Sequence, residues 1–162
     1  MKVTRNHRIT RSQQASREIV CALLAQQTPV QFAPRGPSMH PLLRDGDCVR
    51  IVPAALDFLR PGHLVLYRAH GRLILHRLIR RKGSGLHICA DAALAGCEQV
   101  AGTDLLGVAE TRWRDGRERQ LDTRLARWWG LGRYYARPLR SWAQGVRNAA
   151  RRKRRQNAGG QL

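Results

Sequence analysis

The sequence has no apolar run that approaches the ~20 residues needed for a membrane-spanning helix, although the chain is 162 residues long. The N-terminus is basic, but its apolar stretch, Ile19–Ala25, is short and lacks a convincing cleavage site. We therefore expect neither a transmembrane span nor an export signal. This absence predicts a cytoplasmic protein, either free or held peripherally on the inner face of the membrane.

Paired cysteines of the CxxC type are also missing. The four cysteines are Cys21, Cys48, Cys89 and Cys97, and no cluster of cysteine and histidine has the spacing of a zinc site. Three of them have apolar neighbours, where a free thiol behaves as a small hydrophobic group. We expect buried, reduced cysteines rather than a disulfide or a metal centre, and we expect no cofactor.

Acidic residues are few. The chain has 11 Asp and Glu against 30 Lys and Arg, which gives a formal net charge of +19. The excess lies at the two ends, chiefly beyond residue 111, whereas residues 28–111 are close to balanced. Strongly basic ends attract anionic partners such as membrane surfaces or nucleic acid. The balanced middle is predicted to be the globular domain.

The pattern of apolar residues divides the chain into three parts. Residues 1–27 form a basic N-terminal segment, in which helical spacing of apolar residues predicts an amphipathic helix over 12–27. Residues 28–117 form a β domain, and residues 118–162 form a basic, amphipathic helical tail. The boundaries follow the changes in charge and periodicity.

Short strands separated by turn signals fill the middle part. We expect strands within residues 29–34 and 46–54, three strands over 62–91, and two over 104–121. Turns are predicted at His70–Gly71, in residues 81–85 and at Asp115–Gly116. This arrangement predicts a mostly β fold with a coiled, antiparallel, barrel-like sheet.

One serine lies between two prolines. Ser38 belongs to the segment GPSMHP, residues 36–41, whose prolines stiffen the backbone on both sides. A small hydroxyl held in this way is typical of a side chain that is presented rather than buried. A serine hydroxyl becomes an effective nucleophile only when a neighbouring base removes its proton.

Lysine, one possible base, is nearly absent. Lys2 and Lys153 lie in the basic ends, and Lys82 lies in a glycine-rich turn where its ammonium group stays solvated and protonated. His76, in the segment LILHRL, is a better candidate. Histidine already titrates near neutral pH, so it needs no large pKa shift to act as a base.

The order of these segments resembles the signal peptidase-like serine peptidases, the superfamily that includes the LexA-type self-cleaving repressors. The resemblance covers about residues 30–110 and rests on the segments GPSMHP, RDGD, RPGHLVLYR, LILHRLI and ADA. It implies a LexA-type β fold with Ser38 as nucleophile and His76 as base, at the family's lysine position as in its histidine variant. It also implies that Asp91 orients His76 in a Ser-His-Asp arrangement.

Each candidate residue also has a structural interpretation. Ser38 can be a turn hydroxyl, His76 a packed strand histidine, and Asp91 a turn former or helix cap. Asp45 and Asp47 flank a glycine and are expected to form a turn rather than an acid–base pair.

Three positions bear on the resemblance. Ala90 stands where the family has a glycine before the aspartate, and Gly62–His63 stands where it has Gly-Asp. Gly36 offers no side-chain hydroxyl to a developing oxyanion. The backbone N–H of Ser38 is therefore the main candidate to stabilise that oxyanion.

The tail carries an aromatic stripe among arginines. Gly130, Gly132 and Pro138 weaken a single helix, so two helical segments around a bend are expected. Aromatic rings beside arginines favour an anionic membrane surface, and nucleic acid or a tail that covers the β domain remain alternatives. The stripe follows three-four spacing through Leu121, Leu125, Trp128, Tyr135, Leu139, Trp142 and Val146.

These observations predict a serine endopeptidase that cleaves leader- or signal-type peptides, or itself, through Ser38, His76 and Asp91. The alternative from another class is a catalytically inactive β scaffold whose basic ends bind anionic membrane or nucleic acid. Neither interpretation requires a metal or a cofactor.

Overall fold

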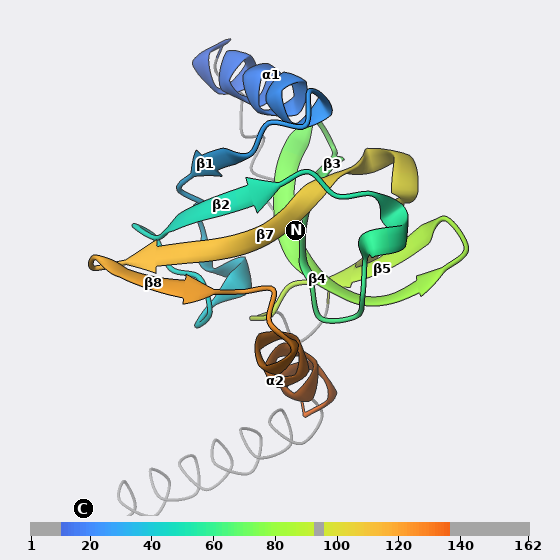
Figure 1. The fold of residues 1–162 in the computed structure, drawn as a ribbon. Coiled ribbons are helices and arrows are strands. Elements are labelled where there is room, and N and C mark those ends of the chain that lie inside the picture. The colour runs from blue at the N-terminus through green and yellow to red at the C-terminus, as the bar shows by residue number, and fades with distance from the viewer. Residues whose placement is uncertain (1–10, 93–95, 137–162) are drawn as a thin grey trace, which may run out of the picture.

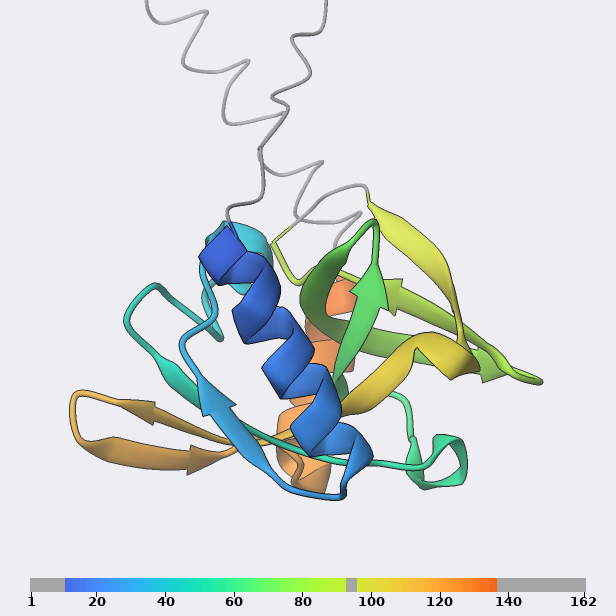
Figure 2. The ribbon, with the colours of Figure 1, turned by 90° about the horizontal axis from the view of Figure 1, so that it is seen from above.

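The computed structural model describes residues 11–92 and 96–136. A helix at each end flanks one curled antiparallel sheet (Figure 1). Helix α1 spans Arg11–Ala25, and helix α2 spans Arg124–Tyr135. Seen from above, α1 lies across the sheet (Figure 2). None of the helices in this part of the chain is long and apolar enough to cross a membrane.

The sheet has eight strands, and the fold is mostly β, as predicted. Strands follow the order β1-β2-β7-β3-β4-β5-β6, with β8 paired to β7. Short 3-10 turns stand between some of them: η1 (Pro37–Met39), η2 (Leu56–Phe58) and η3 (Gly102–Asp104). The strands are β1 (Val30–Phe32), β2 (Cys48–Val52), β3 (Leu64–Ala69), β4 (Arg72–Lys82), β5 (Gly85–Cys89), β6 (Cys97–Ala101), β7 (Leu105–Arg114) and β8 (Arg117–Gln120).

Two hairpin turns form where the sequence predicts them. His70 and Gly71 have φ values of 51° and 66°, and Asp115 and Gly116 have φ values of 49° and 71°. Two consecutive residues with positive φ match the right-handed twist of the strands that they join. The structure contains every strand expected within residues 29–121. It also contains β6, an additional strand that the sequence pattern did not predict.

Apolar side chains pack into two clusters, one on each face of the sheet. Successive residues of a strand point to opposite faces, so β3 contributes Leu64 and Leu66 to one cluster and Val65 and Tyr67 to the other. Leu24 of α1 belongs to the first cluster. The N-terminal helix is thus part of the domain core, although the sequence predicted a separate segment.

The boundary expected between residues 117 and 118 is also displaced. Strand β8 crosses it and pairs with β7 as far as Gln120, and Leu121 is buried in the first cluster. Helix α2 then continues through Gly130 and Gly132, so both glycines lie within one helix. The second predicted segment of the tail lies outside the described residues.

The prediction for the cysteines is wrong at two positions. Cys89 and Cys97 form a disulfide, and the side chain of Cys97 lies at the surface. Their sequence separation of 8 matches no zinc-site spacing, but antiparallel pairing of β5 with β6 places them directly opposite each other. Cys21 and Cys48 are free thiols, as expected, but both are half-buried rather than buried.

Candidate functional site: the serine turn and the strand that carries His76

The serine turn is held by backbone geometry and by one carboxylate. Gly36 has a φ of 99°, which a residue with a side chain rarely adopts. Its N–H donates to Oδ1 of Asp45 at 2.8 Å. The turn then enters η1, which carries Ser38 and buries Met39 in the core. The backbone is therefore fixed on both sides of the serine.

Asp47 has a structural task, as the sequence predicted. Its carboxylate accepts the backbone N–H of Arg44 at 2.9 Å and two N–H groups of Arg114 at 2.6 and 2.7 Å. Burial alone would raise the pKa of Asp47, but the hydrogen bonds from Arg114 and Arg44 outweigh it and lower that pKa. A carboxylate engaged in this way ties the turn to β7.

Ser38 is half-buried, and its carbonyl is occupied. The backbone N–H of Ala92 donates to the Ser38 oxygen at 2.9 Å. Among residues 11–92 and 96–136, neither the Ser38 hydroxyl nor its N–H has a hydrogen-bonding partner. The turn packs against β4, the strand that carries His76. No hydrogen bond joins the serine hydroxyl to the imidazole within that same described part of the chain.

His76 belongs to a hydrogen-bonded chain with Tyr67 and Glu98. The Tyr67 hydroxyl lies 3.1 Å from Nδ1 of His76 and donates its proton to Glu98. Burial and the neighbouring Glu98 raise the pKa of Tyr67, so the hydroxyl stays protonated. Because its proton goes to Glu98, its oxygen is free to accept the Nδ1–H of His76. This network assigns the proton to Nδ1 and leaves a lone pair on Nε2.

The pKa of His76 is set by two opposing effects. Burial lowers it, while the negative charges of Glu98 and Asp91 raise it by a smaller amount. The net shift is downward from 6.5, so the imidazole is neutral at pH 7. Nδ1 also lies 3.7 Å from a Glu98 oxygen, which is close enough to stabilise an imidazolium once a proton arrives. A neutral imidazole beside a carboxylate can accept and return a proton.

Asp91 does not meet His76 directly, which differs from the sequence expectation. Both of its oxygens accept N–H groups of Arg77, each at 2.7 Å. The two side chains are almost fully buried, with exposed fractions of 1% for Arg77 and 3% for Asp91. Arg77 follows His76 in β4 and therefore points to the opposite face. The carboxylate that faces His76 is Glu98.

Asp91 still has a connection to the serine turn. Its neighbour, Ala92, donates the hydrogen bond to the Ser38 carbonyl. The buried pair of Asp91 with Arg77 thus fixes the segment whose next residue, Ala92, is hydrogen-bonded to the Ser38 carbonyl. In this geometry Asp91 is a positioning residue, and Glu98 with Tyr67 holds the imidazole.

Helix α2 covers the buried arginine. The third N–H group of Arg77, on Nη1, donates to the Gly62 carbonyl at 2.7 Å. A Cβ atom at Gly130 of α2 would overlap the Arg77 guanidinium, and one at Gly62 would lie 2.6 Å from Cβ of Arg127. Glycine at both positions therefore lets the helix approach the sheet closely.

Glu98 and Tyr67 were missed by the sequence analysis. Glu98 lies on β6, a short strand with four of its five residues exposed or half-buried, and short polar segments give a weak strand signal. Tyr67 was placed in a strand, but nothing in its neighbourhood marked it as a partner of His76. The available clue is that Tyr67 and Val65 share a face and that Val65 lies opposite His76.

Compared with known proteins, the chain matches none of the known family models and none of the curated proteins.

Proposed function

We propose that this protein is a serine endopeptidase of the signal peptidase-like type, with Ser38 as nucleophile and His76 as general base. The observation that carries the proposal is the chain from Glu98 through Tyr67 to His76, because it leaves an unprotonated Nε2 on a neutral imidazole. The serine turn packs against the strand of that imidazole. Catalytic hydrogen bonds often form only when substrate binds, so the missing bond to Ser38 is compatible with this role.

The proposed chemistry is acyl transfer. Nε2 of His76 takes the Ser38 proton as the serine oxygen attacks the scissile carbonyl, and the resulting imidazolium is stabilised by Glu98. The backbone N–H of Ser38 stabilises the oxyanion. The imidazolium then protonates the leaving amine, the peptide bond breaks, and water later hydrolyses the acyl-enzyme. Asp91 contributes by holding the segment behind Ser38.

The substrate class follows from the resemblance alone. It favours leader- or signal-type peptides with small residues near the cleaved bond, or the chain itself. A dedicated peptidase that matures one secreted or ribosomally made peptide is the form of this function that we favour.

Active-serine labelling tests this proposal. A fluorophosphonate probe should label the wild type, and labelling should be lost in Ser38→Ala and strongly reduced in His76→Ala. Lys82→Ala is the control, because Lys82 is exposed at the end of β4 and should be dispensable. Equal labelling of wild type and Ser38→Ala would refute the nucleophile, and loss of labelling in Lys82→Ala with His76→Ala unaffected would refute the base.

Helix α2 supports a second proposal, a peripheral site for an anionic membrane. Its outer face exposes Leu125, Trp128 and Tyr135, with exposed fractions of 84%, 73% and 67%. These residues share one side of the helix because their spacing follows the helical repeat. Arg124 and Arg133 lie on the same helix. Rings at headgroup depth with arginines beside them match an anionic bilayer surface, here the cytoplasmic one.

Vesicle sedimentation tests the membrane proposal. The full chain should sediment with phosphatidylserine-containing vesicles, and the double substitution Leu125→Ser with Trp128→Ser should release it. Ile19→Ser is the matched control, because Ile19 is 59% exposed on the other helix. Moderate salt should weaken binding only in part, since buried rings are not screened. Indifference to vesicles together with a steep, salt-dependent affinity for nucleic acid would assign the basic ends to nucleic acid instead.

A further inference from the structure

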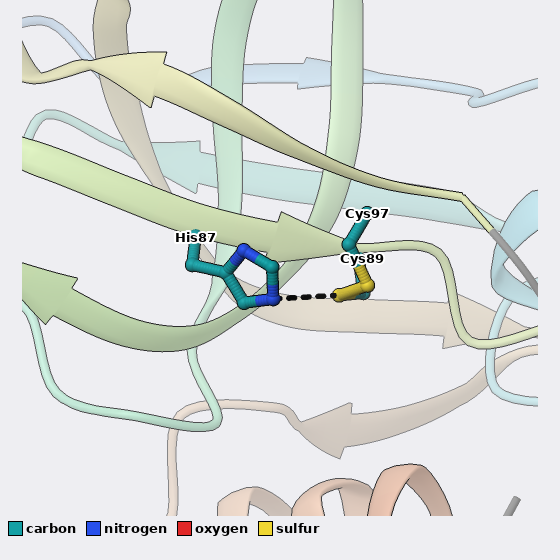
Figure 3. Close-up of side chains that lie close together, drawn as sticks. All are labelled: His87, Cys89 and Cys97. Carbon is teal, nitrogen blue, oxygen red and sulfur yellow. Dashed lines mark hydrogen bonds between the residues drawn. A yellow bond between two sulfur atoms is a disulfide. The ribbon is translucent and has the colours of Figure 1, made fainter.

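Three possible metal ligands lie together on the outer edge of the sheet. His87 and Cys89 are two residues apart on β5, so their side chains leave the same face. Cys97 lies opposite Cys89 on β6, and Gln99 lies opposite His87. Figure 3 shows the imidazole of His87 directed at the sulfur pair. The fold therefore makes a nitrogen and two sulfurs converge from two adjacent strands.

The distances match a shared metal ion once the sulfurs separate. Nε2 of His87 is 3.9 Å from Sγ of Cys89, and the three ligand atoms all lie within 4.8 Å of one another. Zinc–sulfur bonds of about 2.3 Å and zinc–nitrogen bonds of about 2.0–2.1 Å place tetrahedral ligand atoms about 3.5–3.8 Å apart. The 3.9 Å between Nε2 of His87 and Sγ of Cys89 is already close to this ligand–ligand distance. Only the sulfur–sulfur bond has to break for the three atoms to bind one metal ion.

The surroundings also suit a metal. The amide nitrogen of Gln99 lies 2.9 Å from Nδ1 of His87. Rotation of the amide group by half a turn brings its oxygen to that position, where it can accept the Nδ1–H that a zinc-bound imidazole carries. Cys89 is buried, His87 is half-buried and Cys97 is exposed. One side of the cluster is therefore open to solvent, which gives an entry path and room for water as a fourth ligand.

We propose that reduction of the Cys89–Cys97 disulfide creates a Zn²⁺ site formed by Nε2 of His87 and the two thiolates. A dithiol reductant of the thioredoxin type gives two electrons and two protons to the disulfide and becomes a disulfide itself. Zn²⁺ then displaces the two thiol protons into solution and binds both sulfurs as thiolates. In an oxidising compartment the pair stays cross-linked, and in a reducing compartment the metal takes its place. This proposal does not depend on the peptidase function proposed for Ser38 and His76, because it uses none of the same residues.

Metal titration of the full chain tests this inference. Protein reduced with a phosphine should bind one Zn²⁺ in competition with a chromogenic chelator and release two protons, and oxidised protein should not bind at this site. Co²⁺ should give the near-ultraviolet thiolate-to-metal band and the visible bands of a tetrahedral ion.

Variants separate this site from adventitious binding. Cys97→Ser and His87→Ala should each weaken binding at least tenfold, and Gln99→Ala about tenfold. Cys48→Ser is the matched control, because Cys48 is a free, half-buried cysteine, and it should bind as the wild type does. Circular dichroism checks that each variant folds. No binding by reduced protein, equal binding by oxidised protein, or unchanged affinity in Cys97→Ser would each overturn the proposal.

Discussion

Two consecutive residues of β4 belong to two different kinds of polar network. His76 keeps 16% of its side chain exposed, and its partner Glu98 keeps 31%. Arg77 and Asp91 are buried. Nε and Nη2 of the arginine donate hydrogen bonds to Asp91, and Nη1 donates to the Gly62 carbonyl. The first network can gain and lose a proton at little cost, whereas the second cannot lose one partner without leaving a buried charge. One strand therefore separates titratable chemistry from structural anchoring by pointing alternate residues to opposite faces.

Removal of Asp91 should give the largest effect on stability. Asp91→Ala leaves the Arg77 guanidinium buried without its carboxylate, and we expect the free energy of unfolding to fall by about 3–5 kcal/mol. Urea unfolding followed by circular dichroism measures this change. Asp57→Ala is the control, because Asp57 pairs with Arg81 while its side chain is 96% exposed, and it should cost at most about 1 kcal/mol. Equal losses in both variants would contradict the structural role of Asp91.

The contact between α2 and Arg77 gives the next largest expected effect. In Gly130→Ala, the new Cβ overlaps the guanidinium, and we expect a loss of about 1–3 kcal/mol. Gly132→Ala is a matched change two residues away, where nothing lies within 4 Å, and it should stabilise the helix by up to about 1 kcal/mol. Urea unfolding followed by tryptophan fluorescence compares the two. The same sign for both substitutions would show that α2 does not sit on Arg77.

His63 should make the α2 side of the fold sensitive to acid. Burial and the nearby charge of Arg127 lower the pKa of His63 from 6.5 to about 4. The unfolded chain therefore takes up a proton at a higher pH than the folded one. The stability contributed by neutral His63 is fully present above pH 6.5 and is lost as the pH falls toward 4.

The test is the urea midpoint measured from pH 7 to pH 4. Its decline should be shallower in His63→Gln, which does not titrate, than in the wild type. His70→Asn serves as the control because His70 is exposed in a turn and its positive φ suits asparagine. A wild-type decline that persists in His63→Gln would assign the acid sensitivity to another group.

The smallest change in stability, with a defined change in titration, is expected at Glu98. In Glu98→Gln, the negative charge that raises the pKa of His76 disappears, so that pKa should fall further below 6.5. Histidine resonances in NMR spectra recorded against pH report this shift without a substrate. In the proposed mechanism the neutral imidazole is the base, so the rate of peptide cleavage by the wild type is expected to rise with pH through the same region. A higher pKa of His76 in the variant would contradict the proposed network.

Local sequence patterns were sufficient to predict most of the helices and strands, but not which side chains contact each other in the folded protein. Alternating apolar residues and turn signals located β1 to β5, β7, β8 and the hairpin turns, because both depend on neighbouring residues. Glu98, by contrast, reaches Tyr67 and His76 only through the pairing of β6 with β5, which local pattern does not encode. Asp91 could have paired with either of two adjacent residues of β4, His76 or Arg77. These two side chains point to opposite faces of the sheet, and Asp91 lies on the face of Arg77. The sequence pattern predicts that Gly130 weakens the helix, yet its missing side chain is what allows α2 to approach Arg77 closely.

Strand β6 has a consequence for the accuracy of folding. It lies at the edge of the sheet, carries Glu98 toward His76 and carries Cys97 toward Cys89. A slip of one residue against β5 would exchange the two faces, turning the carboxylate away from the imidazole and the sulfur away from its partner. Cross-linking of Cys97 to Cys89 can therefore take place only in the register that also assembles the imidazole network. A molecule in which this disulfide has formed is therefore one in which β6 paired with β5 in the correct register.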